Sequence, residues 1–214
     1  MSSRRVSGRF LLALCVVSSL PALLASKNFV KPVAQPAKNY PAHDIHNDEK
    51  VGIAADPYDS AEKAKIFSVN FQEAGFLPIF FIVTNDGDQP ISIAKMQITL
   101  ITANHSKLTP ASPDDIYRRL SNPQAQTRPS PIPIPHKKVK GAVGQKEMDE
   151  IESSQFEARA VEPHGTQSGF LFFDVDGISS PLAGANLDIT GVADAKGNEL
   201  MFFEIAMPEP PATH

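Results

Sequence analysis

The sequence has no tryptophan and a single cysteine, Cys15, among its 214 residues. Cys15 lies in an apolar stretch near the N-terminus, within a segment typical of export signals. Once that segment is removed, no cysteine remains for a disulfide, a thiol nucleophile or a cysteine-based metal site. An exported domain of about 190 residues must then be stabilised by its hydrophobic core alone, which is feasible at this size.

Residues 1–25 have the composition of a signal peptide. Three arginines precede the apolar run 10–20, and Ala25 suits the position just before a cleavage site. The alternative is an uncleaved membrane anchor, which the shortness of the apolar run and Pro21 disfavour. We therefore expect a secreted or periplasmic protein that makes no integral membrane contact after cleavage.

The sequence also lacks an excess of basic residues, with 20 lysines and arginines against 24 aspartates and glutamates. Removal of Arg4, Arg5 and Arg9 with the signal leaves 17 basic residues against the same 24 acidic ones. A chain with this negative balance is a poor match for nucleic acid or for an anionic membrane surface.

No strong catalytic motif is present: the sequence contains no Gly-x-Ser-x-Gly, no His-Glu-x-x-His and no glycine-rich phosphate loop. The best acid–base candidate is His164, beside Glu162 and with Ser168 or Asp174 nearby in the chain. Exposure on a turn is the simpler interpretation of His164. We therefore assign no catalytic residue, no metal ligand, no cofactor-binding residue and no cofactor, and the protein is more readily interpreted as a non-enzyme.

Several polar groups have weak alternative interpretations. A metal could be held by His43 and His46 followed by Asp48 and Glu49, or calcium by Asp56 with Asp59 or by Asp174, Asp176 and Asp188. For each set the simpler interpretation is a solvated tail, a turn or ordinary surface carboxylates. Asn104-His105-Ser106 is formally a glycosylation acceptor, relevant only if the source glycosylates.

Long hydrophobic runs of strand character dominate the middle of the chain. The run 77–84 (LPIFFIVT) is apolar at both parities, which predicts a central strand covered on both faces. The turn formers at 85–88 separate it from a second run at 91–102, so the two runs are expected to pair as a hairpin. A change of phase at Ala94-Lys95 predicts a bulge in the second run.

Seven strands are predicted in all, at 65–71, 77–84, 90–102, 156–161, 168–175, 185–192 and 199–207, with turns at 85–88, 162–166 and 194–198. In the last strand Met201, Phe203, Ile205 and Met207 are expected to face the core. Ser60 predicts the start of a short helix at 61–64, and Ser112 followed by Pro113 the start of another. A third helix is predicted at 147–155. The fold class that follows is an all-β, immunoglobulin-like antiparallel sandwich with short helices in an insertion.

The remaining segments complete the expected domain organisation. Residues 26–50 are predicted to form a proline-rich tether, and 51–208 the sandwich with its insertion at 112–155. The insertion includes a proline-rich segment at 121–140, in which Pro and Ile alternate at 129–135 and predict polyproline II, with docking to an aromatic groove as the less favoured role. Lys137, Lys138 and Lys140 follow as a basic patch, and 209–214 form a disordered tail.

The stretches LPIFFIVTNDGDQPI at 77–91 and EPHGTQSGFLFF at 162–173 resemble those of uncharacterised bacterial secreted or surface proteins with an immunoglobulin-like domain. The resemblance covers about 65–102 and 156–207 and leaves 121–150 without a counterpart. It implies a fold and an export route, and it carries no catalytic residues to transfer.

Two functions from different classes follow. The first is an exported, non-enzymatic binding or structural module of the cell envelope, whose loops or proline-rich insertion contact another envelope or extracellular protein or a surface polymer. The alternative is a metal-dependent or His/carboxylate hydrolase accessory protein that uses His164, or His43 and His46, with nearby carboxylates. A concave site that gathers histidine and carboxylates would favour the second function, and convex loops would favour the first.

Overall fold

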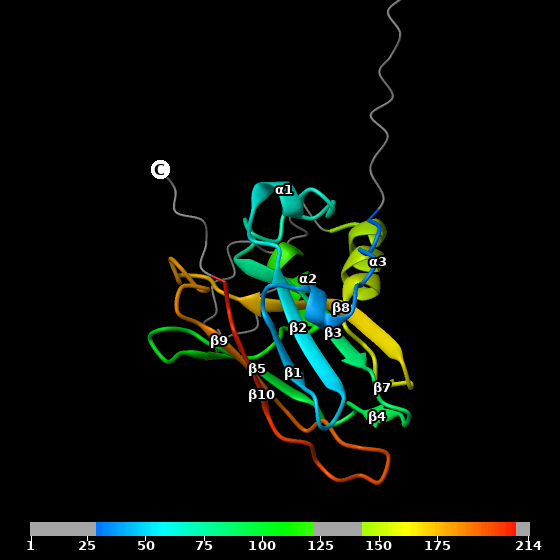
Figure 1. Cartoon of the computed structure of the whole chain (residues 1–214). Coiled ribbons are helices and arrows are strands. Elements are labelled where there is room, and N and C mark those ends of the chain that lie inside the picture. Colours follow the sequence, from blue (N-terminus) through cyan, green and yellow to red (C-terminus); the bar gives the residue numbers. More distant parts are fainter. Residues whose placement is uncertain (1–28, 122–142, 209–214) are drawn as a thin grey trace, which may run out of the picture.

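The computed structural model describes residues 29–121 and 143–208, and Figure 1 shows the whole chain. The expected signal peptide, the 129–135 segment, the lysines at 137, 138 and 140 and the C-terminal tail lie outside the described residues. The described helices are η1 (Ala37–Asn39), α1 (Ala61–Ala64), α2 (Pro113–Ser121) and α3 (Gln145–Ser154). The described strands are β1 (His43–His46), β2 (Val51–Pro57), β3 (Phe76–Asn85), β4 (Ile91–Ser92), β5 (Gln97–Ile101), β6 (Lys107–Leu108), β7 (Ala160–Val161), β8 (Gly165–Asp174), β9 (Asn186–Thr190) and β10 (Phe203–Ala206).

The described strands form two four-stranded sheets and one small pair, all antiparallel. The first sheet has the order β1-β2-β3-β8, the second the order β10-β9-β5-β6, and β4 pairs with β7. In Figure 1 the helices lie to one side of the first sheet, away from the second sheet. The predicted all-β class is confirmed.

A mainly aliphatic core fills the space between the two sheets. Strand β3 contributes the alternating residues Leu77, Ile79, Phe81 and Val83, which are all buried. The second sheet contributes Leu100, Leu187, Ile189, Phe203 and Ile205 to the same cluster. Because side chains alternate along a strand, the residues between these in β3 point to the other face of the first sheet.

That outer face carries a second core, rich in aromatic rings. Phe80, Phe170 and Phe172 are each about 99% buried there, and their rings pack against one another. The cover consists of the N-terminal segment, the 65–75 loop and the helices, through the residues Phe29, Ala37, Tyr40, Phe67, Val69, Phe71, Ile116 and Ile151. The prediction that 77–84 forms a strand covered on both faces is confirmed.

The predicted strand at 65–71 is wrong. Residues 65–71 run through turns and bends after α1, although Val69 and Phe71 are buried. The backbone N–H groups of Ser68 and Val69 donate to the carboxylate of Glu150 on α3 instead of to a neighbouring strand. The alternating pattern therefore identified the buried side chains but not the backbone conformation that buries them.

The structure also differs from the expected tether at 26–50. From residue 29 onward this segment packs on the outer face of the first sheet, and it contributes the edge strand β1. Large apolar side chains are few in both strands, with Ile45 in β1 and Val51 and Ile53 in β2, so neither forms the long apolar run by which strands are found in a sequence. Gly52 has a structural reason, because a Cβ there would lie 2.6 Å from Cδ1 of Ile45.

The predicted hairpin of 77–84 with 91–102 is not formed. Strand β3 pairs with β2 and β8, and the chain after Asn85 passes through β4 into the second sheet. In place of the expected bulge there is a turn in which the N–H of Met96 donates to the carbonyl oxygen of Ile93 at 3.1 Å. The inward positions before and after it, Ile91, Ile93, Ile98 and Leu100, are nevertheless all buried.

The three predicted helices are confirmed, and they belong to the packed domain. Ser60 accepts a hydrogen bond from the N–H of Lys63, and Ser112 from that of Asp115, as expected for N-caps. Ile116 of α2 and Ile151 of α3 are buried in the outer core. The predicted strand at 156–161 is reduced to the two residues of β7. Before β7, the N–H of Phe156 donates to the carbonyl oxygen of Phe170 in β8, and the carbonyl oxygen of Arg159 accepts from the N–H of Ile93.

Candidate functional site

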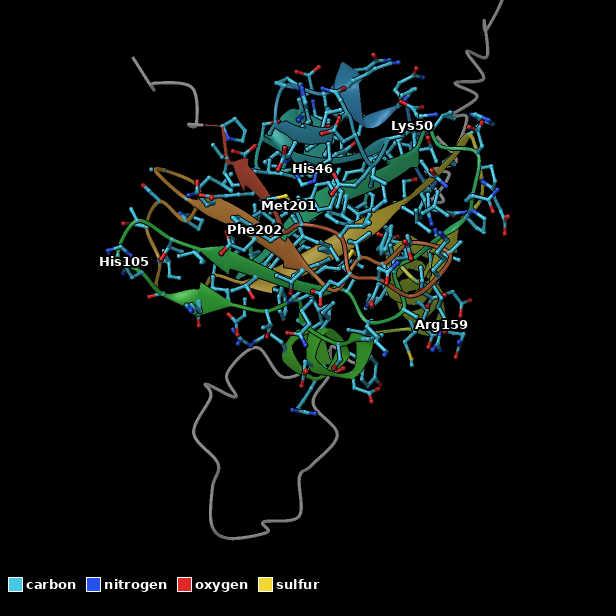
Figure 2. All side chains as sticks on the ribbon, turned by 60° about the horizontal axis from the view of Figure 1, so that its bottom comes forward. His46, Lys50, His105, Arg159, Met201 and Phe202 are labelled. Atoms are coloured by element: carbon cyan, nitrogen blue, oxygen red, sulfur yellow. The ribbon has the colours of Figure 1, made fainter. Side chains whose placement is uncertain are left out.

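The edge strands of the two sheets, β1 and β10, lie side by side and border a surface groove of about 380 Å³. The β1–β2 turn forms one wall, and the chain that leads into β10 forms the other. The lining residues are Asp44, His46, Asn47, Asp48, Glu49, Met201, Phe202 and Glu204. Figure 2 shows His46, Met201 and Phe202 close together, with His105 and Arg159 on other parts of the surface. We refer to this site as the β1–β10 groove.

His46 lines the β1–β10 groove and is held in place from three sides. Its Nε2 lies 3.4 Å from Oδ2 of Asp44, and its Nδ1 lies 3.0 Å from Oε2 of Glu49. Its ring stacks on that of Phe203, with centroids 3.9 Å apart and planes 17° from parallel. Both ring nitrogens therefore face acceptors, and His46 links the β1–β2 turn to the end of the second sheet.

Asp44 joins the two sheet edges directly. Its Oδ2 accepts a hydrogen bond of 3.0 Å from the backbone N–H of Glu204 in β10. This satisfies a donor on the open edge of β10 that would otherwise be free to pair with another strand. Glu204 in turn accepts a bond of 2.7 Å from the side chain of Asn186. Asp44 and Glu204 thus join the strands β1 and β10, from which the turn 47–49 and the segment 201–202 extend to line the groove.

The charge of the groove is of one sign. Asp44, Asp48, Glu49 and Glu204 line it, and no lysine or arginine is among its lining residues. A second hollow of about 330 Å³ continues from it, sharing two of these carboxylates. That hollow adds Asp88 and Asp194, together with Lys50, whose Nζ lies 3.4 Å from the Asp88 carboxylate. The two hollows make a continuous acidic strip.

Beside these carboxylates two large apolar side chains face solvent. Met201 is 67% exposed and Phe202 is 57% exposed. Among the described residues, the other large hydrophobic side chains with this degree of exposure are Val30 and Val33, near the N-terminal end. Neighbouring apolar residues on the surface that also line a groove mark a contact site more often than a lone exposed one does.

The expectation that Met201 faces the core is wrong, whereas Phe203, Ile205 and Met207 are buried as predicted. The alternation begins only at Phe203, where β10 begins. Before it, the N–H of Leu200 still donates to the carbonyl oxygen of Val192 in the register of the β9–β10 pair, but Met201 and Phe202 lie outside the strand. The sequence did carry a signal, because the run 200–203 is apolar at both parities while this edge of the sheet covers only one.

The structure does not bring together the acid–base candidates around His164. His164 is on the turn before β8, with φ +54°, and its Nε2 lies 3.2 Å from Oδ1 of the exposed Asp88. Asp174 is at the opposite end of β8, where it pairs with Arg119. His164 and Asp174 therefore cannot share one substrate.

The metal candidates are also separated. His43 and His46 are three residues apart on β1, so their side chains leave opposite faces of the strand. Asp174 and Asp176 pair with Arg119, whereas Asp188 lies on β9 in the other sheet. Asp56 pairs with Lys63, and the Asp59 carbonyl accepts from Gln72. In 29–121 and 143–208, no three histidine, cysteine or carboxylate side chains are placed to hold a metal ion together.

No protein-family model, no curated protein and no solved structure matches the chain. None of the helices in the described part of the chain is both long enough and apolar enough to span a bilayer.

Proposed function

We propose that the protein is an exported, non-enzymatic binding module that uses the β1–β10 groove as its contact site. The observation that carries this proposal is the exposure of Met201 and Phe202 beside a groove whose bordering strands, β1 and β10, are joined by a hydrogen bond between Asp44 and Glu204. A domain stabilised by its core gains nothing from two large apolar side chains in water, whereas a binding surface does. The expected signal at 1–25 supports the export route.

The proposal includes an immunoglobulin-like sandwich, which the order of the strands supports. Apart from β1 and the short β4–β7 pair, the described strands number seven. The first, second and fifth of them lie in one sheet as β2-β3-β8, and the seventh, sixth and third lie in the other as β10-β9-β5. Immunoglobulin-like domains divide their strands in this way. The fourth strand, β6, pairs with the third, where constant-type domains pair it with the fifth.

Site-specific photocrosslinking in the cells of origin tests the proposal. A photoreactive amino acid replaces Phe202 in one variant and Arg159, an exposed residue away from the groove, in a matched control. We expect a discrete crosslinked product in the exported fraction with the first variant and none with the second. Equal products from both positions, or none from either, would contradict the groove as the contact site.

A further inference from the structure

We infer that the partner enters the β1–β10 groove with a basic segment in which lysine or arginine alternates with large apolar residues. This inference rests on the proposed binding function and specifies the chemistry of the partner. Two features of the groove carry it, namely the exposed pair Met201 and Phe202 and the set of carboxylates that faces them.

The apolar pair determines one half of the partner's chemistry. A planar ring and a flexible thioether on neighbouring residues form a small, adaptable apolar surface, which is best covered by leucine, isoleucine, methionine or an aromatic ring. Because Phe202 is more than half exposed in the free protein, contact with such a side chain would remove much of its area from water.

The carboxylates determine the other half. Asp44 and Glu49 are already engaged with His46, whereas Asp48 is exposed in the turn at the rim of the groove. The strip continues past Asp48 to Asp88 and Asp194, with Lys50 as the one cation among the residues that line the two hollows. Because these carboxylates outnumber Lys50, a cationic segment lying along this strip is attracted to it, whereas an acidic peptide or a nucleic acid is repelled.

A metal ion is a less suitable occupant than a peptide. The carboxylates are spread along the strip, and no three of the described histidine, cysteine or carboxylate side chains are placed to hold one ion. A guanidinium or ammonium group does not need three converging ligands, because it can pair with a single carboxylate or with two neighbouring ones.

The test is fluorescence anisotropy with three labelled peptides and the purified protein. The probe is GKLKFKLG, and its controls are GELEFELG, which reverses the charge, and GKGSKGSK, which removes the apolar residues. We expect the probe to bind, with an affinity that falls as salt is added, and the controls to bind at least about tenfold more weakly. Equal binding of all three peptides, or no binding of the probe, would overturn the inference.

Two variants locate the binding at the groove. Phe202→Ser is expected to weaken the probe about tenfold and Asp48→Asn about threefold, while the matched charge removal Glu157→Gln changes nothing. Because Phe202, Asp48 and Glu157 are all exposed, circular dichroism should show each variant folded. Unchanged affinity in both groove variants would overturn the assignment.

One further arm separates a partner from the chain's own basic residues. A variant with 122–142 replaced by a short Gly-Ser linker is expected to bind the probe as the full chain does. Binding about tenfold tighter would show that Lys137, Lys138 and Lys140 compete for the groove, and the assignment to a separate partner would fall. If the probe fails to bind while Phe202 still crosslinks in cells, only the partner chemistry is wrong. If both experiments fail, the proposed function is wrong too.

Discussion

The inner face of the first sheet packs against a second sheet, whereas its outer face packs against helices, loops and the N-terminal segment. Three of the 23 buried residues of the described inner core are aromatic, against six of the twelve in the outer core. Regular sheets bring rows of branched aliphatic side chains together at a fixed spacing. The irregular cover on the outer face leaves gaps of varied shape, which large rings fill from several directions.

The two faces of the first sheet also differ in how the backbone hydrogen-bonding groups of the chain that covers them find partners. The inner core lies between hydrogen-bonded ladders, but the outer cover depends on side-chain contacts from distant parts of the chain. Glu150, which is only 4% exposed, accepts from the N–H groups of Ser68 and Val69 and from the Ser68 hydroxyl. Arg119 spans from α2 to Asp174 and Asp176 at the end of β8. The outer cover is therefore an integral layer of the domain.

The largest expected effect comes from removing a ring on each face. Phe81→Ala on the inner face and Phe170→Ala on the outer face should each lower the free energy of unfolding by about 3–5 kcal/mol, because both rings are fully buried. Urea denaturation measures the change. Phe202→Ala, at an exposed ring, serves as the control and should shift the value by less than about 0.5 kcal/mol. A loss below about 1 kcal/mol for Phe170→Ala alone would mean that the outer layer is not a core.

A smaller effect is expected when the buried carboxylate of Glu150 is removed. Glu150→Ala leaves the N–H groups of Ser68 and Val69 without their acceptor and should cost about 1–3 kcal/mol. Glu150→Gln keeps one acceptor oxygen and should cost less. Faster amide exchange at 68 and 69 in the alanine variant would accompany the loss. If alanine and glutamine cost the same, the hydrogen bonds are not what holds the 65–75 loop.

The N-cap of α2 gives a third and weaker test. Ser112→Ala removes the acceptor for the N–H of Asp115 and should lower stability by about 1 kcal/mol. The hydrogen bond from Ser112 also lowers the pKa of the Asp115 carboxyl, and Arg118 adds to this. The variant should therefore raise the Asp115 pKa in an NMR titration. An unchanged Asp115 pKa would contradict the capping geometry.

The smallest effect at neutral pH is expected from removing the hydroxyl of Tyr58, a residue of the outer core. Burial, with the Asp56 carboxylate and Tyr40 adding to it, raises the pKa of Tyr58 from 10.0 to about 12. The unfolded chain then loses this proton first, so the stabilising contribution is complete below pH 10 and disappears between pH 10 and about 12. Tyr58→Phe should remove this part of the loss of stability at alkaline pH, as measured by urea denaturation at a series of pH values. Identical pH profiles for the two proteins would be inconsistent with a buried hydroxyl.

Much of this two-faced arrangement could be predicted from the sequence, and particular residues explain the rest. The run 77–84 directly indicates burial on both faces of the sheet, because both its odd-numbered and its even-numbered residues are mainly apolar. Strand β1 escaped prediction because an edge strand is held by backbone pairing and by contacts such as Asp44 with Glu204. The false strand at 65–71 arose because burial of Val69 and Phe71 has the same pattern whether the chain is extended or turned.

The candidate groove was visible in the sequence only in part. The sequence indicated His46, Asp48 and Glu49 only as weak candidates for metal ligands, and the structure instead places them in the lining of a groove. Met201 and Phe202 were expected to follow the strand, whereas β10 begins only at Phe203. Which edges of two sheets meet is a property of the whole topology, so no short pattern could have located the site.

Two of the hollows in the described part of the molecule differ in character, and one measurement shows which of them binds the probe. The hollow over the outer core, of about 280 Å³, is lined by Tyr58, Phe67 and Phe71, whereas the β1–β10 groove is acidic with an exposed apolar wall. Backbone amide spectra of the isotopically labelled protein, recorded during titration with GKLKFKLG, report which of the two responds. We expect shift changes concentrated at 44–50 and 200–204. Changes concentrated at 58–72 would contradict it.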